Sequence, residues 1–353
     1  FEAHLAEGAS IGEDPTAFLR HALGFHLLDP AMGCGLFLQW AKEAMSARLI
    51  EVLETRGDGW PAASVAEGVA ATALYGVDIQ AEAVAAARRF LSSCEARHLR
   101  HANALLGIFR ESGLPDRETW GAIDALLEAY ASDLEHVPIF AAEREAFERR
   151  LRELSRRMRP LRNRLDAVLP RSLSHPKPLH WEVTFPEVFA RRGGFDVVLG
   201  NPPFVRILRQ ERKEKRFLGR LFSFAEGNFD LYVCFVELAW RLVRPGGRIG
   251  LILPDGVLTQ RYARRLRRTL LSSGTIEVIE EVTGGEHFDG ASVHPLLLVV
   301  RKSAPLSNHR IRIRRQGAGE ESGGEIELAQ AEIGGGEETV IRIVPPPLLH
   351  FLR

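Results

Sequence analysis

The sequence has few cysteines, no long apolar run and no excess of charge of either sign. Its three cysteines, Cys34, Cys94 and Cys234, lie far apart and form no C-x-x-C pair, which argues for a reducing compartment and against a zinc site. No apolar run approaches the ~20 residues of a membrane span, and no signal peptide is visible. These absences predict a cytoplasmic protein that needs neither a membrane nor a metal ion.

The overall composition is that of a globular protein. Among 353 residues, 45% are hydrophobic and 26% are charged, which suits one large domain or two small ones. The 46 basic residues balance the 46 acidic ones, so any binding to nucleic acid requires a locally basic face. Because the chain begins with Phe1, we expect its natural N-terminus to be missing.

The most informative stretch is FDVVLGNPPFVR, residues 195–206. Its first five residues are apolar and β-branched around one acid, which predicts a short buried strand ended by Gly200. Pro202 and Pro203 then fix two φ angles and remove two backbone donors, and Asn201 is pushed out of the helical region by the proline that follows it. We therefore expect a stiff loop at the carboxyl end of a strand, where open α/β sheets bind ligands.

This loop carries groups that suit a planar amine. The exocyclic amine of adenine is a poor nucleophile because its lone pair is delocalised into the ring. Two acceptors, the side-chain carbonyl of Asn201 and the backbone carbonyl of Pro202, can pull on its two hydrogens and localise the lone pair. Phe204 can stack on the ring. The alternative is a proline-stiffened turn without catalytic function.

Two further βα turns contain residues typical of nucleotide binding. FHLLDPAMGCGLFL, residues 25–38, predicts a strand, a glycine turn and a helix, in which Gly33 and Gly35 allow close approach of a ligand. ALYGVDIQ, residues 73–80, predicts a second strand that ends at Asp78, where Rossmann-like folds bind ribose hydroxyls. The alternative for Asp78 is capping of the next helix.

These motifs together resemble the N6-adenine DNA methyltransferases of the type IIG restriction-modification kind, whose relatives act in phage-defence systems such as BREX and DISARM. The resemblance rests on DPAMGCGLFL, GNPPF and GNFDLYVCFVELAWRLVRPGGRIGLILPDGVL, and spans about residues 25–302 in the order of the family. Cys34 replaces the serine of the family's glycine loop. The Thr-Pro segment that usually holds the amino-acid end of the cofactor is not found.

The resemblance implies a fold, a cofactor and a set of site residues. The fold is α/β, a Rossmann-like class I methyltransferase with a seven-stranded, mostly parallel sheet. The cofactor is S-adenosyl-L-methionine, the substrate is double-stranded DNA with a flipped-out adenine, and subunits of a defence or restriction complex are possible partners. The implied site consists of catalytic Asn201, Pro202, Pro203 and Phe204, base-stacking Phe204 and Phe288, and cofactor-binding Asp29, Pro30, Ala31, Gly33, Gly35, Asp78, Ile79, Asn103 and Ala104.

For domain organisation, we expect a methyltransferase domain at 1–304 with a helical insertion at about 111–180. The basic run at 144–165 predicts a helical hairpin or pair with a solvated face. Residues 305–353 predict a linker or the start of a further, target-recognising module. A plain turn role for Asn103 and a plain packing role for Phe288 remain open.

Other functions also remain open. The same loop could methylate RNA or a glutamine amide of a protein, because any planar amine or amide suits it. N4-cytosine methylation is a further alternative, although the family more often carries Ser at the Asn201 position for that reaction. The chain could also be a DNA-binding subunit without turnover. A C5-cytosine mechanism needs a nucleophilic cysteine after a proline, and no cysteine here fits.

Overall fold

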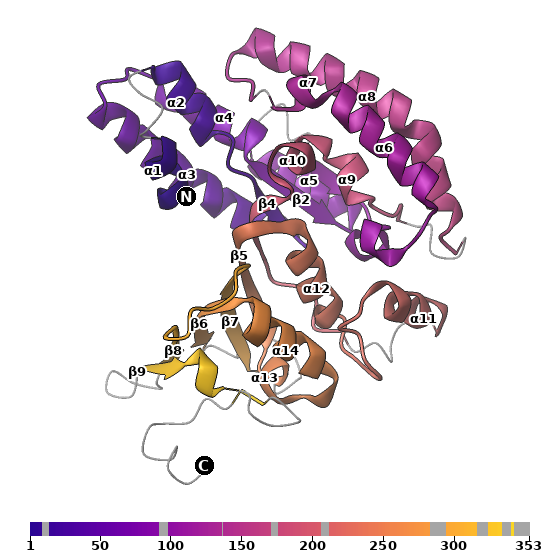
Figure 1. Cartoon of the computed structure of the whole chain (residues 1–353). Helices are drawn as coiled ribbons and strands as arrows, with labels where there is room; N and C mark the ends of the chain where they lie inside the picture. Colours follow the sequence, from indigo (N-terminus) through magenta and orange to yellow (C-terminus); the bar gives the residue numbers. More distant parts are fainter. Residues whose placement is uncertain are drawn as a thin grey trace. The chain divides into compact units, whose positions relative to one another are not determined.

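The computed structural model describes residues 1–8, 14–91, 98–135, 137–170, 176–205, 212–282, 294–315, 324–333 and 340–341. The chain divides into two compact units, Phe1–Asp196 and Val197–Arg353 (Figure 1). Within the described residues, no helix is both long enough and apolar enough to cross a bilayer.

The strands are hydrogen-bonded in the order β3-β2-β1-β4-β5-β7-β6-β8-β9. The predicted α/β, Rossmann-like class is confirmed, but the predicted count of seven strands is wrong, because two strands follow β6 at one edge. The bounds are β1 (Leu27–Asp29), β2 (Leu74–Asp78), β3 (Leu99–His101), β4 (Phe195–Gly200), β5 (Val243–Pro254), β6 (Thr275–Glu281), β7 (Pro295–Arg301), β8 (Arg310–Arg315) and β9 (Gly324–Ala329).

The first unit is built on parallel strands. Leu27 of β1 pairs with Leu74 of β2, and Asp78 at the end of β2 pairs with His101 at the end of β3. Parallel strands require crossover connections, which helices supply here. Between β1 and β4 these are α3 (Leu36–Thr55), α4 (Ala62–Thr72), α5 (Ala81–Phe90), α6 (Arg117–Ala129), α7 (Ala131–Glu135), α8 (Ala141–Ala167), α9 (Trp181–Thr184) and α10 (Pro186–Arg192). The helices α1 (Glu2–Gly8) and α2 (Pro15–Ala22) precede β1.

The basic run at 144–165 forms one continuous helix and not the predicted hairpin or pair. It belongs to α8, which runs for 27 residues through Pro160 and packs against α6 (Figure 1). Leu154, Met158, Leu161 and Leu165 are buried at helical spacing, so packing of this apolar face offsets the missing hydrogen bond at the proline. The bounds of the insertion as a separate domain stay a prediction.

An aromatic cluster forms the centre of the first unit. The ring of Tyr75 on β2 stacks on His98 with centroids 4.0 Å apart, and its edge meets the rings of Phe185 and Phe195 at 5.2 Å. Trp181 is fully buried and donates its indole N–H to the carbonyl of Ala104 at 3.2 Å. The cluster therefore fixes the segment that follows β3 as well as the start of β4.

The second unit surrounds a helix buried over most of its length. Every residue from Tyr232 to Ala239 of α12 (Tyr232–Leu242) is buried, so this part of the helix has no solvent-exposed face. Strand β5 starts at once, at Val243, and continues through Pro245, Gly246 and Gly247 to Pro254. The other helices are α11 (Arg212–Leu221), α13 (Gly256–Thr259) and α14 (Arg264–Ser273).

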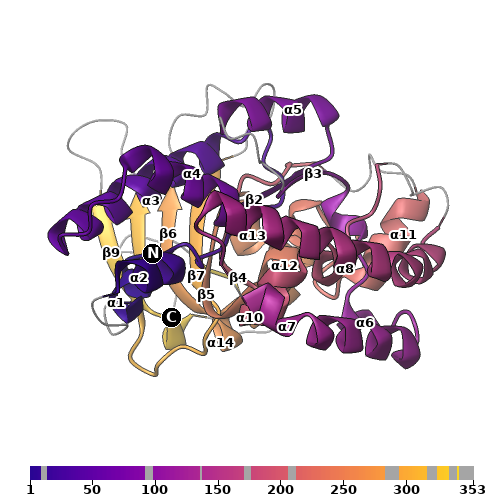
Figure 2. The same ribbon diagram turned by 90° about the horizontal axis from the view of Figure 1, so that it is seen from above.

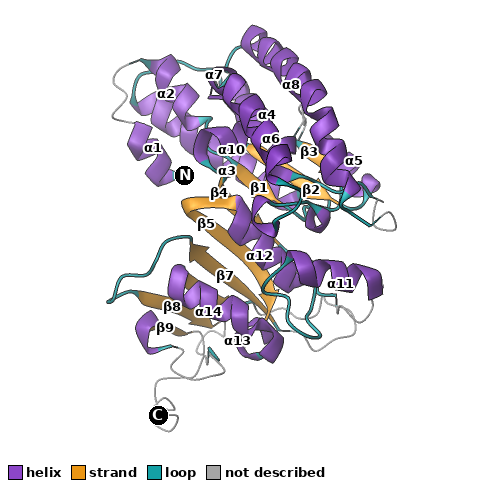
Figure 3. Cartoon of the chain, turned by 45° about the vertical axis from the view of Figure 1, so that its right-hand side comes forward, coloured by secondary structure: helices purple, strands orange, loops and turns teal. Residues whose placement is uncertain are grey.

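Strand β7 lies between β5 and β6 and runs antiparallel to both (Figure 2). Beyond β6, strand β8 pairs in parallel with β6. Strand β9 pairs antiparallel with β8 and lies next to it (Figure 3). Ile311 and Ile313 of β8 are fully buried, while the alternating arginines Arg310, Arg312 and Arg314 are exposed, as the period of a strand requires. Burial of these isoleucines is what extends the sheet to nine strands.

Candidate active site

The glycine loop connects β1 to α3. Gly33 and Gly35 have φ angles of +54° and +85°, in the region that favours glycine. A Cβ on Gly35 would lie 2.9 Å from the Cβ of Ala87, whereas a Cβ on Gly33 would have no atom within 4 Å. Packing therefore requires glycine at Gly35, and Gly33 borders open space. No side chain caps the first N–H groups of α3, which leaves them available to a ligand.

Asp29, at the end of β1, is a buried carboxyl group with an unsatisfied oxygen. Its side chain is fully buried. Oδ1 accepts from the backbone N–H of Ala31 at 3.0 Å, and Oδ2 has no hydrogen-bond partner among the described residues. Burial raises the pKa of Asp29 to about 7, and the charge of Asp78 adds to this shift. A ligand that brings a donor or a positive charge would satisfy this oxygen.

Asp78, at the end of β2, holds the glycine loop. Oδ2 accepts from the backbone N–H of Gly33 at 2.8 Å, and Oδ1 accepts from that of Gln80 at 2.8 Å. The N-cap of α5 is Gln80, so Asp78 does not cap this helix. Each oxygen retains a lone pair for a further donor. Ile79 beside it is 52% exposed, unusually high for a large apolar side chain and suitable for contact with a flat ring.

The side chain of Asn103 has a structural role, which the sequence alone left open. Its Oδ1 accepts from the backbone N–H of Leu105 at 3.0 Å and so caps the short 3-10 helix Ala104–Leu106. Its Nδ2 makes no hydrogen bond within the described ranges, so this donor remains available to a ligand. Ala104 is buried, and its backbone carbonyl accepts from the indole N–H of Trp181.

The NPPF loop follows β4 and lies in the second unit. Asn201 is exposed, and its carboxamide makes no hydrogen bond with any described residue. Pro202 is buried, Pro203 is exposed and Phe204 is half-buried. The carbonyl of Pro202 also accepts from no described donor. Neither of the two acceptors predicted from the sequence is therefore hydrogen-bonded to a described residue. Phe288, the second predicted stacking residue, lies outside the described residues.

Sequence reasoning missed an acid next to this loop. The backbone N–H of Leu231 donates to the carbonyl of Val205 at 2.9 Å, which places Asp230 beside the end of the loop. Tyr262 donates its hydroxyl to Oδ2 of Asp230 at 2.7 Å, and the hydroxyl of Tyr232 lies 3.3 Å from that of Tyr262. The sequence signal for Asp230 is the segment GNFDLY, in which a single acid precedes an apolar helix.

Helices α1 and α2 carry a group of side chains of the kinds that bind metal ions. His4, Glu7 and His21 place ligand atoms within 4.8 Å of one another. However, Nε2 of each histidine bonds the backbone carbonyl of the other at 2.8 Å, and Nδ1 of His4 lies 3.3 Å from Arg192. Burial lowers the pKa of His4 to about 4. The arrangement ties α1 to α2, and three of its four imidazole nitrogens already have a partner among the described residues.

Comparison with known proteins shows the family of this chain. Residues 72–288 match the model of the Eco57I restriction-modification methylase. The chain is 28% identical over 109 residues to the type II methyltransferase M.BstVI of Geobacillus stearothermophilus, covering 30% of this chain and 19% of that protein. It is 31% identical over 118 residues to the type II methyltransferase M.TthHB8I of Thermus thermophilus, covering 31% and 26%.

Among solved structures, the type IIL restriction-modification enzyme MmeI in complex with DNA matches with a TM-score of 0.49 and 15% identity, over 93% of this chain and 38% of that one. The chain therefore spans well under two thirds of these relatives. The family model covers more than half of the chain and includes β2, the NPPF loop and the buried helix α12. The chain belongs to the Eco57I restriction-modification methylase family.

Proposed function

We propose that this chain transfers a methyl group from S-adenosyl-L-methionine to the N6 amine of an adenine in DNA, as part of a restriction-modification or phage-defence system. The observation that carries the proposal is the pair of uncommitted acceptors after β4, the exposed carboxamide of Asn201 and the carbonyl of Pro202. An exposed amide between a buried strand and two prolines has no packing role. Its role is therefore assigned to a ligand.

The residues at the ends of β1 and β2 fit the proposed cofactor. S-adenosyl-L-methionine carries an ammonium group, a sulfonium and two ribose hydroxyls. Asp29 offers an unsatisfied buried oxygen to positive charge, Asp78 offers its remaining lone pairs to the hydroxyls, and exposed Ile79 offers an apolar surface to the adenine ring. Pro30, Ala31, Gly33 and Gly35 form the turn, and Asn103 and Ala104 are assigned to the adenine edge.

When bound, S-adenosyl-L-methionine supplies a methyl group on a positively charged sulfur, so the reaction needs neither a metal nor a covalent enzyme intermediate. The protein's task is to prepare the acceptor. Asn201 Oδ1 and the carbonyl of Pro202 accept the two N6 hydrogens, which returns electron density to the nitrogen. Phe204 stacks on the base. The adenine must leave the duplex to reach these groups, at a cost of a few kcal/mol.

Tyr262 and Asp230 help to hold the end of this loop in place. Asp230 adjoins the residue that bonds the loop, and Tyr262 fixes its carboxylate. We assign both as positioning residues. The stiffness of the two prolines and this anchor hold the acceptors in place before the base arrives, which is how preorganised polar groups gain catalytic value.

The test identifies the methylated nucleoside. The 353-residue chain is incubated with isotope-labelled S-adenosyl-L-methionine and duplex DNA, RNA or a glutamine-containing protein, and the products are digested and analysed by mass spectrometry. We expect label in N6-methyldeoxyadenosine. Label in N4-methyldeoxycytidine, in RNA or in the protein would replace the proposed substrate. Cofactor binding without transfer to any acceptor, with the natural partners present, would support a DNA-binding subunit instead.

A further inference from the structure

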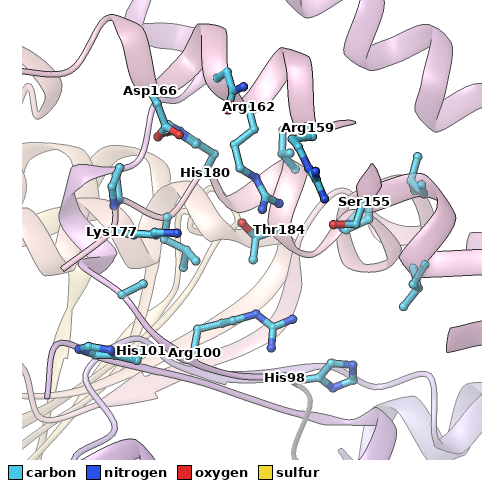
Figure 4. A pocket seen from close by; sticks show the side chains of 18 of the residues that line it. His98, Arg100, His101, Ser155, Arg159, Arg162, Asp166, Lys177, His180 and Thr184 are labelled. Carbon is cyan, nitrogen blue, oxygen red and sulfur yellow. Dashed lines mark hydrogen bonds and ion pairs between the residues drawn. The ribbon is translucent and has the colours of Figure 1, made fainter. Parts of the chain in front are cut away.

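The first unit contains a pocket of about 1010 Å³ that none of the proposed cofactor residues lines. It lies between the edge strand β3, the long helix α8 and the segment 177–187 (Figure 4). Its size is at the upper end of small-molecule sites, which span roughly 300–1,000 Å³. Its charged lining comprises Arg100, Arg152, Arg159, Arg162 and Lys177 against Glu148, Asp166 and Glu187.

The basic side chains converge from opposite walls. Arg159 and Arg162 extend from α8, and Arg100 extends toward them from β3 (Figure 4). Thr184 lies between Arg162 and Arg100, with its hydroxyl toward the same space. Groups of like charge are thus brought together, which is unfavourable unless something negative lies between them.

The acids of the pocket already have other partners. Glu148 pairs with Arg152 at 3.2 Å, Asp166 with His180 at 3.0 Å, and Glu187 lies 3.7 Å from His98. By contrast, four basic side chains of the lining form no ion pair with any described residue: Arg100, Arg159, Arg162 and Lys177. Five cationic and three acidic side chains line the pocket, so the lining has a net positive charge.

Two of these guanidinium groups are also withdrawn from water. Burial lowers the pKa of Arg100, whose neighbours Arg88 and Arg162 lower it further while Glu187 opposes them. Burial likewise lowers the pKa of Arg162, and Asp166 opposes this shift. Arg100 also lies 5.3 Å from the ring centroid of Phe185. Neither guanidinium forms an ion pair with a described residue, and a desolvated charge without an ion-pair partner destabilises a fold. Their presence here is better explained by a ligand than by stability.

A smaller pocket of about 340 Å³ adjoins the first and extends its basic lining. It is lined by Arg152, Ser155, Arg156, Arg159 and Arg162, so it offers one hydroxyl and four guanidinium groups. The larger pocket also has an apolar part, which includes Leu151, Leu154, Leu169, Leu179 and Val183. One side of the combined cavity thus suits several anionic oxygens, and the other suits an apolar or planar group.

We propose that this pocket binds a phosphate-bearing ligand of about nucleotide size. Guanidinium forks match phosphate oxygens bidentately, and Arg100 and Arg162 supply two from opposite sides. The phosphate comes either from a free nucleotide or from the backbone of a nucleic-acid strand. The inference is independent of the proposed methyl transfer, because it concerns other residues and its test measures binding alone.

The experiment compares two probes on the 353-residue chain. Calorimetry is run with ATP, and fluorescence anisotropy with a labelled single-stranded 12-mer. The variants are Arg100→Gln, Arg162→Gln and the matched control Arg149→Gln, which removes an arginine of the same helix that pairs with Glu145 outside both pockets. Thermal melts of each variant without probe verify folding.

We expect at least one probe to bind with one-to-one stoichiometry. We also expect the Kd to rise at least tenfold in Arg100→Gln and in Arg162→Gln, and to stay within twofold in Arg149→Gln. Loss of ATP binding identifies a free nucleotide, and loss of oligonucleotide binding alone identifies a strand. Binding of neither probe overturns the proposal, as does an equal loss in all three variants. If either pocket variant fails to fold, it is replaced by Lys177→Gln, and the same criteria apply. Lys177 is an exposed residue of the pocket lining.

Discussion

The backbone N–H of Gly33 donates to Oδ2 of Asp78 at 2.8 Å. The carboxylate at the end of β2 thus bonds the loop at the end of β1, so a single side chain orders the loop and faces the proposed ribose position. Removal of this side chain affects both functions together.

We expect Asp78→Ala to weaken S-adenosyl-L-methionine binding by tenfold or more, because each lost charge-assisted hydrogen bond is worth roughly 1.5–3 kcal/mol. Asp78→Asn keeps one acceptor and should lose less. Calorimetry measures both, with Glu82→Ala, an exposed acid of α5, as the control. Unchanged affinity in Asp78→Ala would show that this carboxylate serves only the loop.

Gly33 and Gly35 should respond differently to alanine. Gly35→Ala places a Cβ 2.9 Å from Ala87 at a φ of +85°, and should destabilise the fold by roughly 1–3 kcal/mol from backbone strain alone. Gly33→Ala meets no atom within 4 Å, so it should keep more stability but lose cofactor affinity. Denaturant melts and calorimetry on both variants separate the effects. Equal loss of stability would contradict the assignment of Gly33 to ligand approach.

Asp29 should make cofactor binding depend on pH. Its pKa is raised to about 7 in the folded protein from 3.8. The folded state therefore holds a proton that the unfolded state releases, and this contribution to stability, present below about pH 4, is lost as pH rises toward 7. A cationic cofactor favours the charged form, so binding should release about half a proton at pH 7 and strengthen between pH 6 and 8.

Calorimetry in buffers of different ionisation enthalpy measures this proton release. Asp29→Asn should abolish the release and flatten the pH dependence, and without cofactor it should melt at a higher temperature than the natural chain above pH 7. A variant that retains the same pH dependence would assign the titration to another group.

Asn201→Ala should abolish methyl transfer and leave S-adenosyl-L-methionine affinity nearly unchanged. The side chain is assigned to the target amine, and it makes no hydrogen bond whose loss would disturb the described structure. Transfer is followed with labelled cofactor, and affinity by calorimetry. A parallel loss of cofactor binding would place Asn201 in the cofactor site.

Binding of duplex DNA by this chain alone should be weak, insensitive to sequence and steeply dependent on salt, because arginine contacts to phosphate do not read bases. The arginines expected to contact phosphate are the exposed members of the basic runs 144–164, 209–220 and 261–268. Arg267 is buried and bonds two carbonyls, and Arg264 and Arg265 lie near Glu226. Arg261 and Arg268 are exposed.

Each of Arg261→Gln and Arg268→Gln should lower the slope of log affinity against log salt by about 0.9. Filter binding across about 50–200 mM salt measures the slope, with Arg310→Gln, an arginine that pairs with Glu327 outside these runs, as the control. Discrimination between unrelated duplexes by about a thousandfold at physiological salt would place the recognition element within these residues.

The sequence predicts the parts of this protein that local chemistry determines. Asp29, Gly33 and Asp78 lie where strand-turn-helix patterns put them, because a strand period followed by glycine leaves few alternatives. Pairing between distant segments is not encoded in this way. The run HRIRIRR is β-like in sequence, but nothing local shows that it joins β6.

The basic pocket was hidden for a related reason. Arg149 and Arg162 both belong to one arginine-rich helix and are indistinguishable by composition. Arg149 pairs with Glu145 four residues away, whereas Arg162 faces β3 across a cavity. Only tertiary structure distinguishes a solvated ion pair from a half-buried guanidinium that lines a cavity. Asp230 likewise gains its role from Tyr262, 32 residues later.

The hairpin of β8 and β9 has one permitted alignment. Arg310 and Arg314 pair across it with Glu327 and Glu325, while Ile311 faces the interior. A slip by one residue would turn the isoleucines to solvent and direct arginines inward. The outer strand also covers the edge of β8 with charged residues, which discourages another chain from adding to it. The side chains that complete the sheet therefore also disfavour mispairing of its strands and aggregation with other chains.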